Sequence, residues 1–396
     1  MALSWAAVLA RRLARHYLVH PAPRTRLVGV VSEVCGIHAQ VMSSAEMSLG
    51  LRVDGLTARD LAEALWTRRE LLKIYGLRGT VHIVAAEEYG WWSAALQAMD
   101  RERGALDPKR LAYLGITERE FRDLSDAVVD AIAGTQLTRE ELGDAVGKRV
   151  GRRFVDRTVG AFGGAWPVWT AALGHAALRG ELIFGPPRGT RVTFVHPRDW
   201  LGRVATVDPD RALGELFVRF LSAYGPASER DFAQWTASDP AVARNARGAA
   251  GPRVEEVAVE GATQLRVVGE RAPRTSATTL LLPRFDVYAV GSYPRDVVAP
   301  PDLVAKVSAT GLLRRRSGTG RAFLFGPMPV LVLDGVISGI WESKRTAKRM
   351  SIRVQPFVRL ERERRDALEA AAQTLAGITG TTAELAIGAV TTRPHL

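Results

Sequence analysis

The 396-residue sequence predicts an α+β fold in which one pattern occurs three times in tandem: two or three short helices, then two strands joined by a turn. Two observations support this prediction. Apolar residues recur at helical spacing in short runs that begin at polar caps and end at glycines. Each group of such runs is followed by segments rich in β-branched residues and separated by turn residues. We call each occurrence a helix–hairpin repeat.

The first helix–hairpin repeat follows an amphipathic helix within residues 3–20. Arginines interrupt that apolar stretch and no small-residue cleavage site follows, so we expect a folded helix and not a targeting peptide. Ser43 and Ser44, with Glu46 after them, are expected to cap a helix. The elements expected in this repeat are helices at 25–40, 43–52 and 57–67 and strands within 71–84.

The second and third repeats carry clearer boundaries. Thr138 with Glu141 has capping-box spacing, and Ser228 is expected to cap a helix after the helix-ending pair Gly225-Pro226. In the second repeat we expect helices at 118–133, 139–150 and 166–178 and a hairpin of 181–184 with 191–195. In the third we expect a helix at 211–224 and strands at 254–259 and 264–268.

Helices followed by a hairpin are the layout of a winged helix, a helix-turn-helix motif with a β wing. Three copies in a basic chain favour a nucleic-acid-binding protein. We therefore predict three winged-helix units, at 1–110, 111–207 and 208–396. The last is expected to carry a β-rich C-terminal extension, with strands at 323–325, 330–333, 336–340 and 352–354.

Composition limits the function further. A net charge of +12 favours a polyanionic partner. Cys35 is the only cysteine, so an intramolecular disulfide and a zinc–thiolate set are excluded, and its apolar surroundings predict a buried structural thiol. His16 and His20 have the spacing of a metal pair but lack a third ligand, so we expect a solvated helix end and no metal. We expect no cofactor, no membrane association, a cytoplasmic protein, and a monomer without an obligate protein partner.

The assembled pattern resembles the winged-helix DNA glycosylases of the AlkZ/YcaQ type over essentially the whole chain. The resemblance is carried by short motifs in a specific order, namely His38-Ala39-Gln40, 77–82 (LRGTVH), 220–235 with AYGPAS and DFA inside it, 282–288 (LPRFDVY) and 354–357 (VQPF). It implies three winged-helix units that form a concave DNA-binding surface, with a basic hairpin that approaches the lesion. It also implies an active site at a Gln–apolar–Gln or Gln–apolar–Asp triplet in the first unit.

In this chain the triplet falls on His38, Ala39 and Gln40, with histidine in place of the first glutamine. Both polar residues are expected at the end of the 25–40 helix. An N7- or N3-alkylated purine is already cationic, so its excision requires a held water more than a strong acid. Gln40 can orient that water, whereas His38 could either accept its proton or only position it. No lysine is near 30–50 in the sequence, which favours a monofunctional, water-using enzyme.

Basic residues supply the candidate DNA contacts, because phosphate contacts dominate the affinity of such proteins. Arg78 and His82 are expected on one strand face, and Arg188 at the tip of the second hairpin. The remaining candidates are Arg284 in the LPRFDVY motif, the run Arg314, Arg315 and Arg316 before a glycine-rich segment, and the cluster Lys344, Arg345, Lys348 and Arg349.

The sequence therefore predicts a monofunctional DNA glycosylase acting on bulky alkylated purines in duplex DNA, such as N7-alkylguanine and N3-alkyladenine. DNA repair or self-resistance to a genotoxic natural product is the expected role. One alternative is a winged-helix DNA-binding or regulatory protein without catalysis, although such regulators are usually short and dimeric. A nucleic-acid-remodelling or RNA-binding factor is a weaker alternative.

Overall fold

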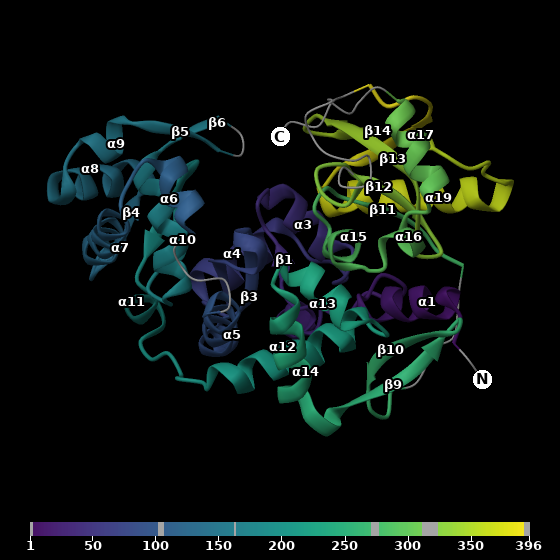
Figure 1. Ribbon diagram of the computed structural model, residues 1–396. Helices are drawn as coiled ribbons and strands as arrows, with labels where there is room; N and C mark the ends of the chain where they lie inside the picture. Colours follow the sequence, from purple (N-terminus) through teal and green to yellow (C-terminus); the bar gives the residue numbers. More distant parts are fainter. Residues whose placement is uncertain (1–2, 102–106, 162–163, 271–276, 311–323, 392–396) are drawn as a thin grey trace. The chain divides into compact units, whose positions relative to one another are not determined.

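The computed structural model describes residues 3–101, 107–161, 164–270, 277–310 and 324–391 (Figure 1). The chain forms two compact units, each assembled from separate stretches of the sequence. Unit 1 comprises Met1–Leu61, Phe217–Trp235 and Gly251–His395, and unit 2 comprises Ala62–Leu216 and Thr236–Ala250. Helices and strands both occur throughout, which confirms the predicted α+β class. The division at 110/111 and 207/208 stays a prediction about the three repeats.

Unit 1 is built on a five-stranded sheet. Its order is β11 (Thr279–Leu282), β12 (Val330–Leu333), β13 (Val336–Arg345), β14 (Arg349–Pro356) and β15 (Thr382–Ile387). All neighbours are antiparallel except β14 and β15. The strands predicted at 330–333, 336–340 and 352–354 are confirmed. The one predicted at 323–325 is not: Phe323 lies outside the described residues, and Leu324 and Phe325 are buried side chains outside any strand.

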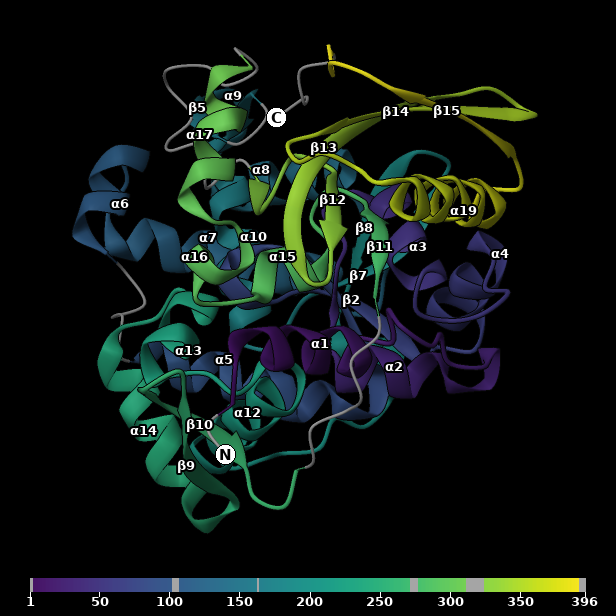
Figure 2. The same cartoon turned by 90° about the vertical axis from the view of Figure 1, so that its right-hand side faces the viewer.

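Helices cover both sides of this sheet at β13, where consecutive side chains are buried, whereas β14 is covered on one side only. Met350, Ile352 and Val354 of β14 are buried, whereas the intervening residues are exposed. Figure 2 shows α19 (Arg362–Ile378) along one side of the sheet and α17 (Pro301–Ala309) on the other side of β13. Leu368, Leu375 and Val307 from these helices join the same core cluster.

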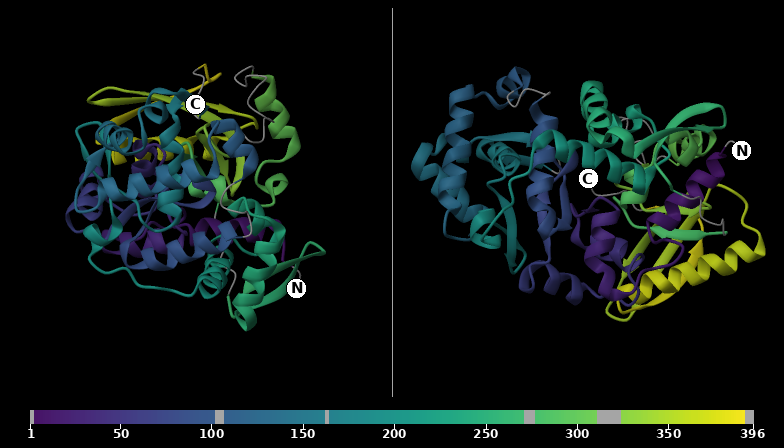
Figure 3. Two further views of the ribbon diagram at one scale, coloured as in Figure 1. Left: turned by 60° about the vertical axis from the view of Figure 1, so that its left-hand side comes forward. Right: turned by 90° about the horizontal axis from the view of Figure 1, so that it is seen from below.

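The remaining helices of unit 1 surround the start of the chain. They are α1 (Trp5–Arg15), α2 (Leu27–Glu33), α3 (Met42–Gly50), α4 (Ala58–Ala62), α13 (Glu229–Thr236), α15 (Val287–Gly291) and α16 (Arg295–Val298). The predicted amphipathic first helix is confirmed as α1. Leu3, just before it, forms backbone hydrogen bonds with the hairpin of β9 (Val254–Val259) and β10 (Ala262–Val267). Figure 3 shows the start of α1 near this hairpin. The segment before α1 is therefore held by the hairpin that was predicted for the third repeat.

The end of α1 differs from the prediction. His20 is exposed, but His16 is completely buried. The centroid of the His16 ring lies 4.7 Å from that of Tyr224 and 5.6 Å from that of Tyr288. The expected solvated helix end is therefore wrong for His16, because aromatic residues from distant parts of the chain close over it. Within the described residues no group of three or more His, Cys, Asp or Glu side chains could hold a metal ion.

Unit 2 contains the segments predicted as the second repeat and as the strands of the first. Its helices are α5 (Tyr89–Arg101), α6 (Pro108–Leu114), α7 (Glu118–Ile132), α8 (Arg139–Val150), α9 (Arg153–Asp156), α10 (Ala171–Leu178), α11 (Pro197–Leu201) and α14 (Pro240–Ala250). Its strands include the hairpins β2 (Leu71–Tyr75) with β3 (Val81–Ala85), β5 (Thr158–Ala161) with β6 (Gly164–Pro167), and β7 (Ile183–Arg188) with β8 (Arg191–Val195). A short strand, β4 (Leu137–Thr138), pairs with β8. The helix α12 (Pro209–Tyr224) runs from unit 2 into unit 1.

Local capping signals predicted these boundaries well. Thr138 and Glu141 form the predicted capping box at the start of α8, and Ser228 accepts a hydrogen bond from the Asp231 N–H at the start of α13. The helix predicted from residue 166 is shorter, because Trp166 belongs to β6 and α10 begins only at Ala171. Among the described residues, none of the helices is long and apolar enough to span a membrane.

Candidate active site and DNA interface

The segment before His38 ends α2 by backbone hydrogen bonds. The N–H of Gly36 donates to the carbonyl of Val31 (2.8 Å), and the N–H of Cys35 donates to that of Ser32 (3.1 Å), which is the Schellman pattern of a helix C-terminus. Cys35 occupies the left-handed position, with φ of 61°. The buried thiol was predicted and is confirmed. The helix predicted to continue to residue 40 is wrong, because α2 already ends at Glu33.

His38 lies instead in a short extended segment, β1 (Ile37–His38). The extended segment stops at His38, and Gln40 lies two residues further on, at a bend before α3. His38 and Gln40 are therefore neighbours in the chain that do not share a regular element. His38 is buried (6% exposed), whereas Gln40 is exposed. A buried imidazole next to an exposed amide suits a site in which one group is held rigidly and the other meets solvent.

The next helix starts without the predicted serine cap. Val41, with an extended backbone, precedes α3, and Ser43 and Ser44 lie inside the helix. Ser44 and Ser48 are buried, so this face of α3 packs inward. The prediction that Ser43 and Ser44 cap the helix is wrong.

A buried ion pair joins the end of α3 to the LPRFDVY motif. Arg52 donates through Nη1 to Oδ2 of Asp286 and through Nη2 to Oδ1, both at 2.8 Å, and both side chains are completely buried. The hydroxyl of Ser48 donates to the same carboxylate at 2.6 Å, and the N–H of Tyr288 donates to it at 2.9 Å. This carboxylate therefore caps α15 and binds α3 at once.

The ring of Phe285, next to that carboxylate, stacks on His38. Their centroids lie 4.9 Å apart and their planes differ by 15°. Neither Phe285 nor the Arg52–Asp286 pair was singled out from the sequence. The only available signal was the LPRFDVY motif itself.

The predicted basic cluster at residues 344–349 lies near α3. Burial raises the pKa of Glu46 in α3, and the charge of Arg345 at the end of β13 acts in the opposite direction. Lys344, Arg345 and Lys348 are exposed and form no ion pair within the described part of the chain. Arg349 is exposed too, but its guanidinium pairs with Glu384 of β15. Three of the four predicted cations at this hairpin are therefore available to a phosphate.

The other predicted contacts differ in environment. Arg188 is bonded to Glu141 through two 2.9 Å hydrogen bonds. Arg284 is half-buried and forms no ion pair with the residues that the structure describes. Arg314, Arg315 and Arg316 lie outside the described residues.

Arg78 and His82 do not share a strand face. Arg78 lies in the tight turn between β2 and β3 with φ of 60°, and His82 is buried in β3 with Nδ1 3.1 Å from the carbonyl oxygen of Thr80. The expected common face is wrong because the strand begins only at Val81. A buried imidazole bonded to its own hairpin is a poor phosphate ligand, so we do not retain His82 as a DNA contact.

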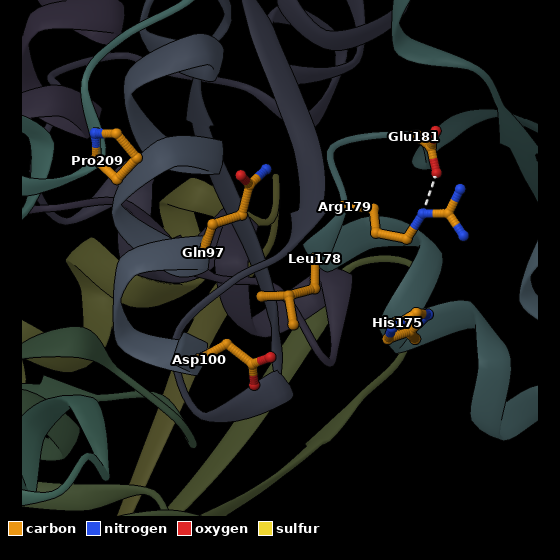
Figure 4. A pocket seen from close by; sticks show the side chains of 7 residues that line it. All are labelled: Gln97, Asp100, His175, Leu178, Arg179, Glu181 and Pro209. Atoms are coloured by element: carbon orange, nitrogen blue, oxygen red, sulfur yellow. Dashed lines mark ion pairs between the residues drawn. The ribbon is translucent and has the colours of Figure 1, made fainter. Parts of the chain in front are cut away.

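Unit 2 holds a pocket of about 510 Å³ between α5 and α10 (Figure 4). Its polar groups largely satisfy one another. Arg179 pairs with Asp126 (2.6 Å) and Glu181 (2.5 Å), and Nδ1 of His175 lies 2.8 Å from the hydroxyl of Ser125. Burial lowers the pKa of His175, and the charge of Arg179 lowers it further. We assign this pocket no part in the chemistry.

One lysine has an altered pKa. Lys73 of β2 lies 5.1 Å from the centre of the Phe184 ring, and burial lowers its pKa to about 8. An amine that is partly neutral near pH 8 is a better nucleophile than an ordinary lysine. Nothing in the sequence distinguished Lys73 from the other lysines.

Comparison with known proteins identifies the family. The family model described as "DNA glycosylase AlkZ-like" matches residues 31–378. The "Interstrand DNA cross-link repair glycosylase" of Streptomyces sahachiroi is 32% identical over 359 residues, which cover 86% of this chain and 88% of that protein. The solved structure of the Streptomyces sahachiroi DNA glycosylase AlkZ superposes with a TM-score of 0.80 at 27% identity, covering 98% of this chain and 100% of the other.

The match extends over both units and includes the segment with His38 and Gln40. It agrees with the resemblance inferred from the short motifs, and it favours catalysis over a binding-only regulator. The chain belongs to the AlkZ-like family and is a DNA glycosylase.

Proposed function

We propose that this DNA glycosylase hydrolyses the N-glycosidic bond of bulky alkylated purines, N7-alkylguanine and N3-alkyladenine, at a site formed by His38 and Gln40. The observation that carries the proposal is the match to the AlkZ-like DNA glycosylase family over residues 31–378, a stretch that includes His38 and Gln40. His38 is held against Phe285, while Gln40 is exposed to an incoming substrate.

The chemistry of the substrate fits this pair of groups. Alkylation at N7 or N3 places a positive charge on the purine, so the base leaves as a neutral molecule without prior protonation. Water then attacks C1′ of a sugar that has acquired positive charge. Gln40 can hold that water through its amide, and the neutral imidazole of His38 can accept the proton that the water releases.

The basic groups of unit 1 support duplex binding. Lys344, Arg345 and Lys348 lie exposed on the β13–β14 hairpin, and the charge of Arg345 acts on Glu46 in the helix that directly follows Gln40. Contacts from these side chains to phosphates would hold the duplex near the site without reading its sequence. We also propose Arg284, Arg188, Arg78 and Arg314 to Arg316 as phosphate contacts, and of these Arg284 is the one beside Phe285.

The biological role that we propose is repair of alkylated DNA, or self-resistance to a compound that alkylates it. The Streptomyces sahachiroi relative is named as an interstrand cross-link repair glycosylase, which makes a cross-linked purine a further candidate substrate. We expect the protein to act as a monomer in the cytoplasm, because three repeats in one chain replace the two chains of dimeric regulators.

The experiment is release of base from a duplex that contains a single N7-alkylguanine. Purified protein should release the alkylated base and leave an abasic site, and a matched undamaged duplex should stay intact. A second arm uses a duplex with an interstrand cross-link through N7 of guanine and measures strand separation. Tight binding without base release from any alkylated duplex would contradict the proposed substrate class.

A further inference from the structure

The ring of Phe285 is the immediate neighbour of the His38 imidazole. Their planes differ by only 15°, with centroids 4.9 Å apart. The face of a benzene ring carries partial negative charge, so it attracts a cation placed over it. This contact therefore fixes the imidazole plane and places beside it a ring face that attracts positive charge.

The backbone of Phe285 is strained in the position that produces this contact. Its φ is 59°, a left-handed value that bulky side chains seldom adopt. It lies third in a turn that the N–H of Asp286 closes by donating to the carbonyl of Pro283 (3.2 Å), a position usually given to glycine. The Phe285 N–H donates to the carbonyl of Gly326 at 2.8 Å. Strain of this kind persists only where the surrounding structure enforces it, and it concentrates at functional sites.

The surrounding structure anchors both sides of the stack. After Phe285, the carboxylate of Asp286 is held by Arg52 and Ser48, which follow His38 in the chain. Before His38, the carbonyl of Val34 lies 3.4 Å from the hydroxyl of Tyr224, which also lies 3.2 Å from the carbonyl of Val287. The segments before and after His38 are thus both tied to the segment that carries Phe285.

From this geometry we propose that Phe285 is a positioning residue for His38, which holds the imidazole in the orientation needed to take a proton from water and stabilises the imidazolium that results. The proposal rests on the proposed function of His38. It goes beyond that function because it gives Phe285 a role that acts through His38.

The test uses three substitutions at Phe285. Phe285→Tyr keeps the aromatic face, Phe285→Leu keeps an apolar side chain without that face, and Phe285→Gly removes the side chain while adopting φ of 59° without strain. Phe357→Leu is the matched control, since Phe357 belongs to the core around the five-stranded sheet. Each variant is measured for thermal unfolding, for binding to an undamaged duplex, and for single-turnover release of N7-methylguanine across pH.

We expect Phe285→Leu and Phe285→Gly to bind duplex like the parent protein and to release base about 10-fold or more slowly, with Phe285→Tyr close to the parent. In Phe285→Leu the acid limb of the pH–rate profile should move to lower pH by about half a unit, because the imidazolium loses its cation–π contact. The glycine variant should unfold no earlier than the leucine variant, which separates the loss of activity from a folding defect.

His38→Ala, measured in parallel, distinguishes the two claims. If His38→Ala loses the acid limb but Phe285→Leu keeps both the parent rate and the parent midpoint, the role of Phe285 is overturned and that of His38 stands. A loss of rate in Phe285→Leu no larger than in Phe357→Leu overturns it as well. If His38→Ala retains the acid limb, His38 is not the base and both claims fail.

Discussion

Arg52 and Asp286, 234 residues apart in the chain, form a two-point ion pair that is completely shielded from solvent. Taking two charges out of water is costly, and the pair is favourable only because hydrogen bonds satisfy the carboxylate on several sides. Ser48 and the N–H of Tyr288 supply those bonds. The pair thus joins the helix that follows the candidate site to the turn that packs on His38.

Breaking this pair from one side should destabilise the protein strongly. Arg52→Met leaves an uncompensated buried carboxylate, so the free energy of unfolding in urea should fall by about 3–5 kcal/mol. Arg122→Met is the control, because Arg122 forms an exposed pair with Glu118 one turn away on α7, and its loss should cost about 0.5 kcal/mol or less. Equal losses in the two variants would contradict the structural role given to Arg52.

Gln40 should be needed for base release and not for binding or folding. Its side chain is exposed, so Gln40→Ala should leave the buried core intact. We expect release of an N7-alkylguanine to fall about 100-fold or more, since misplacement of the attacking water is that costly, with duplex affinity nearly unchanged. Gln373→Ala on α19 serves as the control and should release base normally. Equal activity in Gln40→Ala and the parent protein would remove Gln40 from the mechanism.

The three exposed cations of the β13–β14 hairpin should contribute to the salt dependence of duplex binding. Replacement of Lys344, Arg345 or Lys348 by Gln should each reduce the slope of log affinity against log salt by roughly 0.9. The same change at Arg188 or Arg349 should have a smaller effect, because Glu141 and Glu384 already neutralise those guanidiniums. The assay is fluorescence anisotropy on an undamaged duplex at several salt concentrations. If the Lys344, Arg345 and Lys348 variants keep the salt slope of the parent protein, the hairpin does not contact phosphates.

His16 should make stability depend on pH. Burial lowers its pKa well below 6.5, and the nearby charges of Arg52 and Arg12 act in the same direction. The folded state therefore resists protonation, whereas the unfolded chain takes up a proton below about pH 6.5. Stability should be unaffected above that pH and fall by about 1.4 kcal/mol per pH unit below it, down to the folded-state pKa.

Replacing the ring isolates this contribution. His16→Phe should reduce the loss of stability between pH 6.5 and 5, measured by urea unfolding at each pH. His20→Gln should keep the parent dependence, because His20 is exposed. A parent-like loss in His16→Phe would mean that other groups carry the acid sensitivity of the fold.

The sequence was most reliable where the signal was local. Thr138 and Glu141 predicted the start of α8, and a short apolar run at 352–354 predicted the strand β14. It failed where a distant contact or an unusual backbone decided the outcome. Cys35 takes the left-handed position usually held by glycine, so the end of α2 was placed seven residues too late.

The candidate site shows the same division. His38 and Gln40 could be singled out from a short motif, because the functional groups are themselves in that motif. Their setting could not, since Phe285 stacks on His38, Tyr224 contacts Val34, and Arg52 holds Asp286 beside Phe285, all across long stretches of sequence. No local pattern encodes such an encounter between distant residues.

The role of His38 as the base is best tested by the pH–rate profile of single-turnover release of N7-methylguanine, after subtraction of the rate without enzyme. The parent protein should lose activity as the pH falls through the pKa of an imidazole, ordinarily about 6.5. His38→Gln, which restores the commoner triplet, should keep partial activity with a flatter profile, because glutamine holds water but does not titrate. An acid limb that is unchanged in His38→Gln and in His38→Ala would contradict the assignment of His38 as the base.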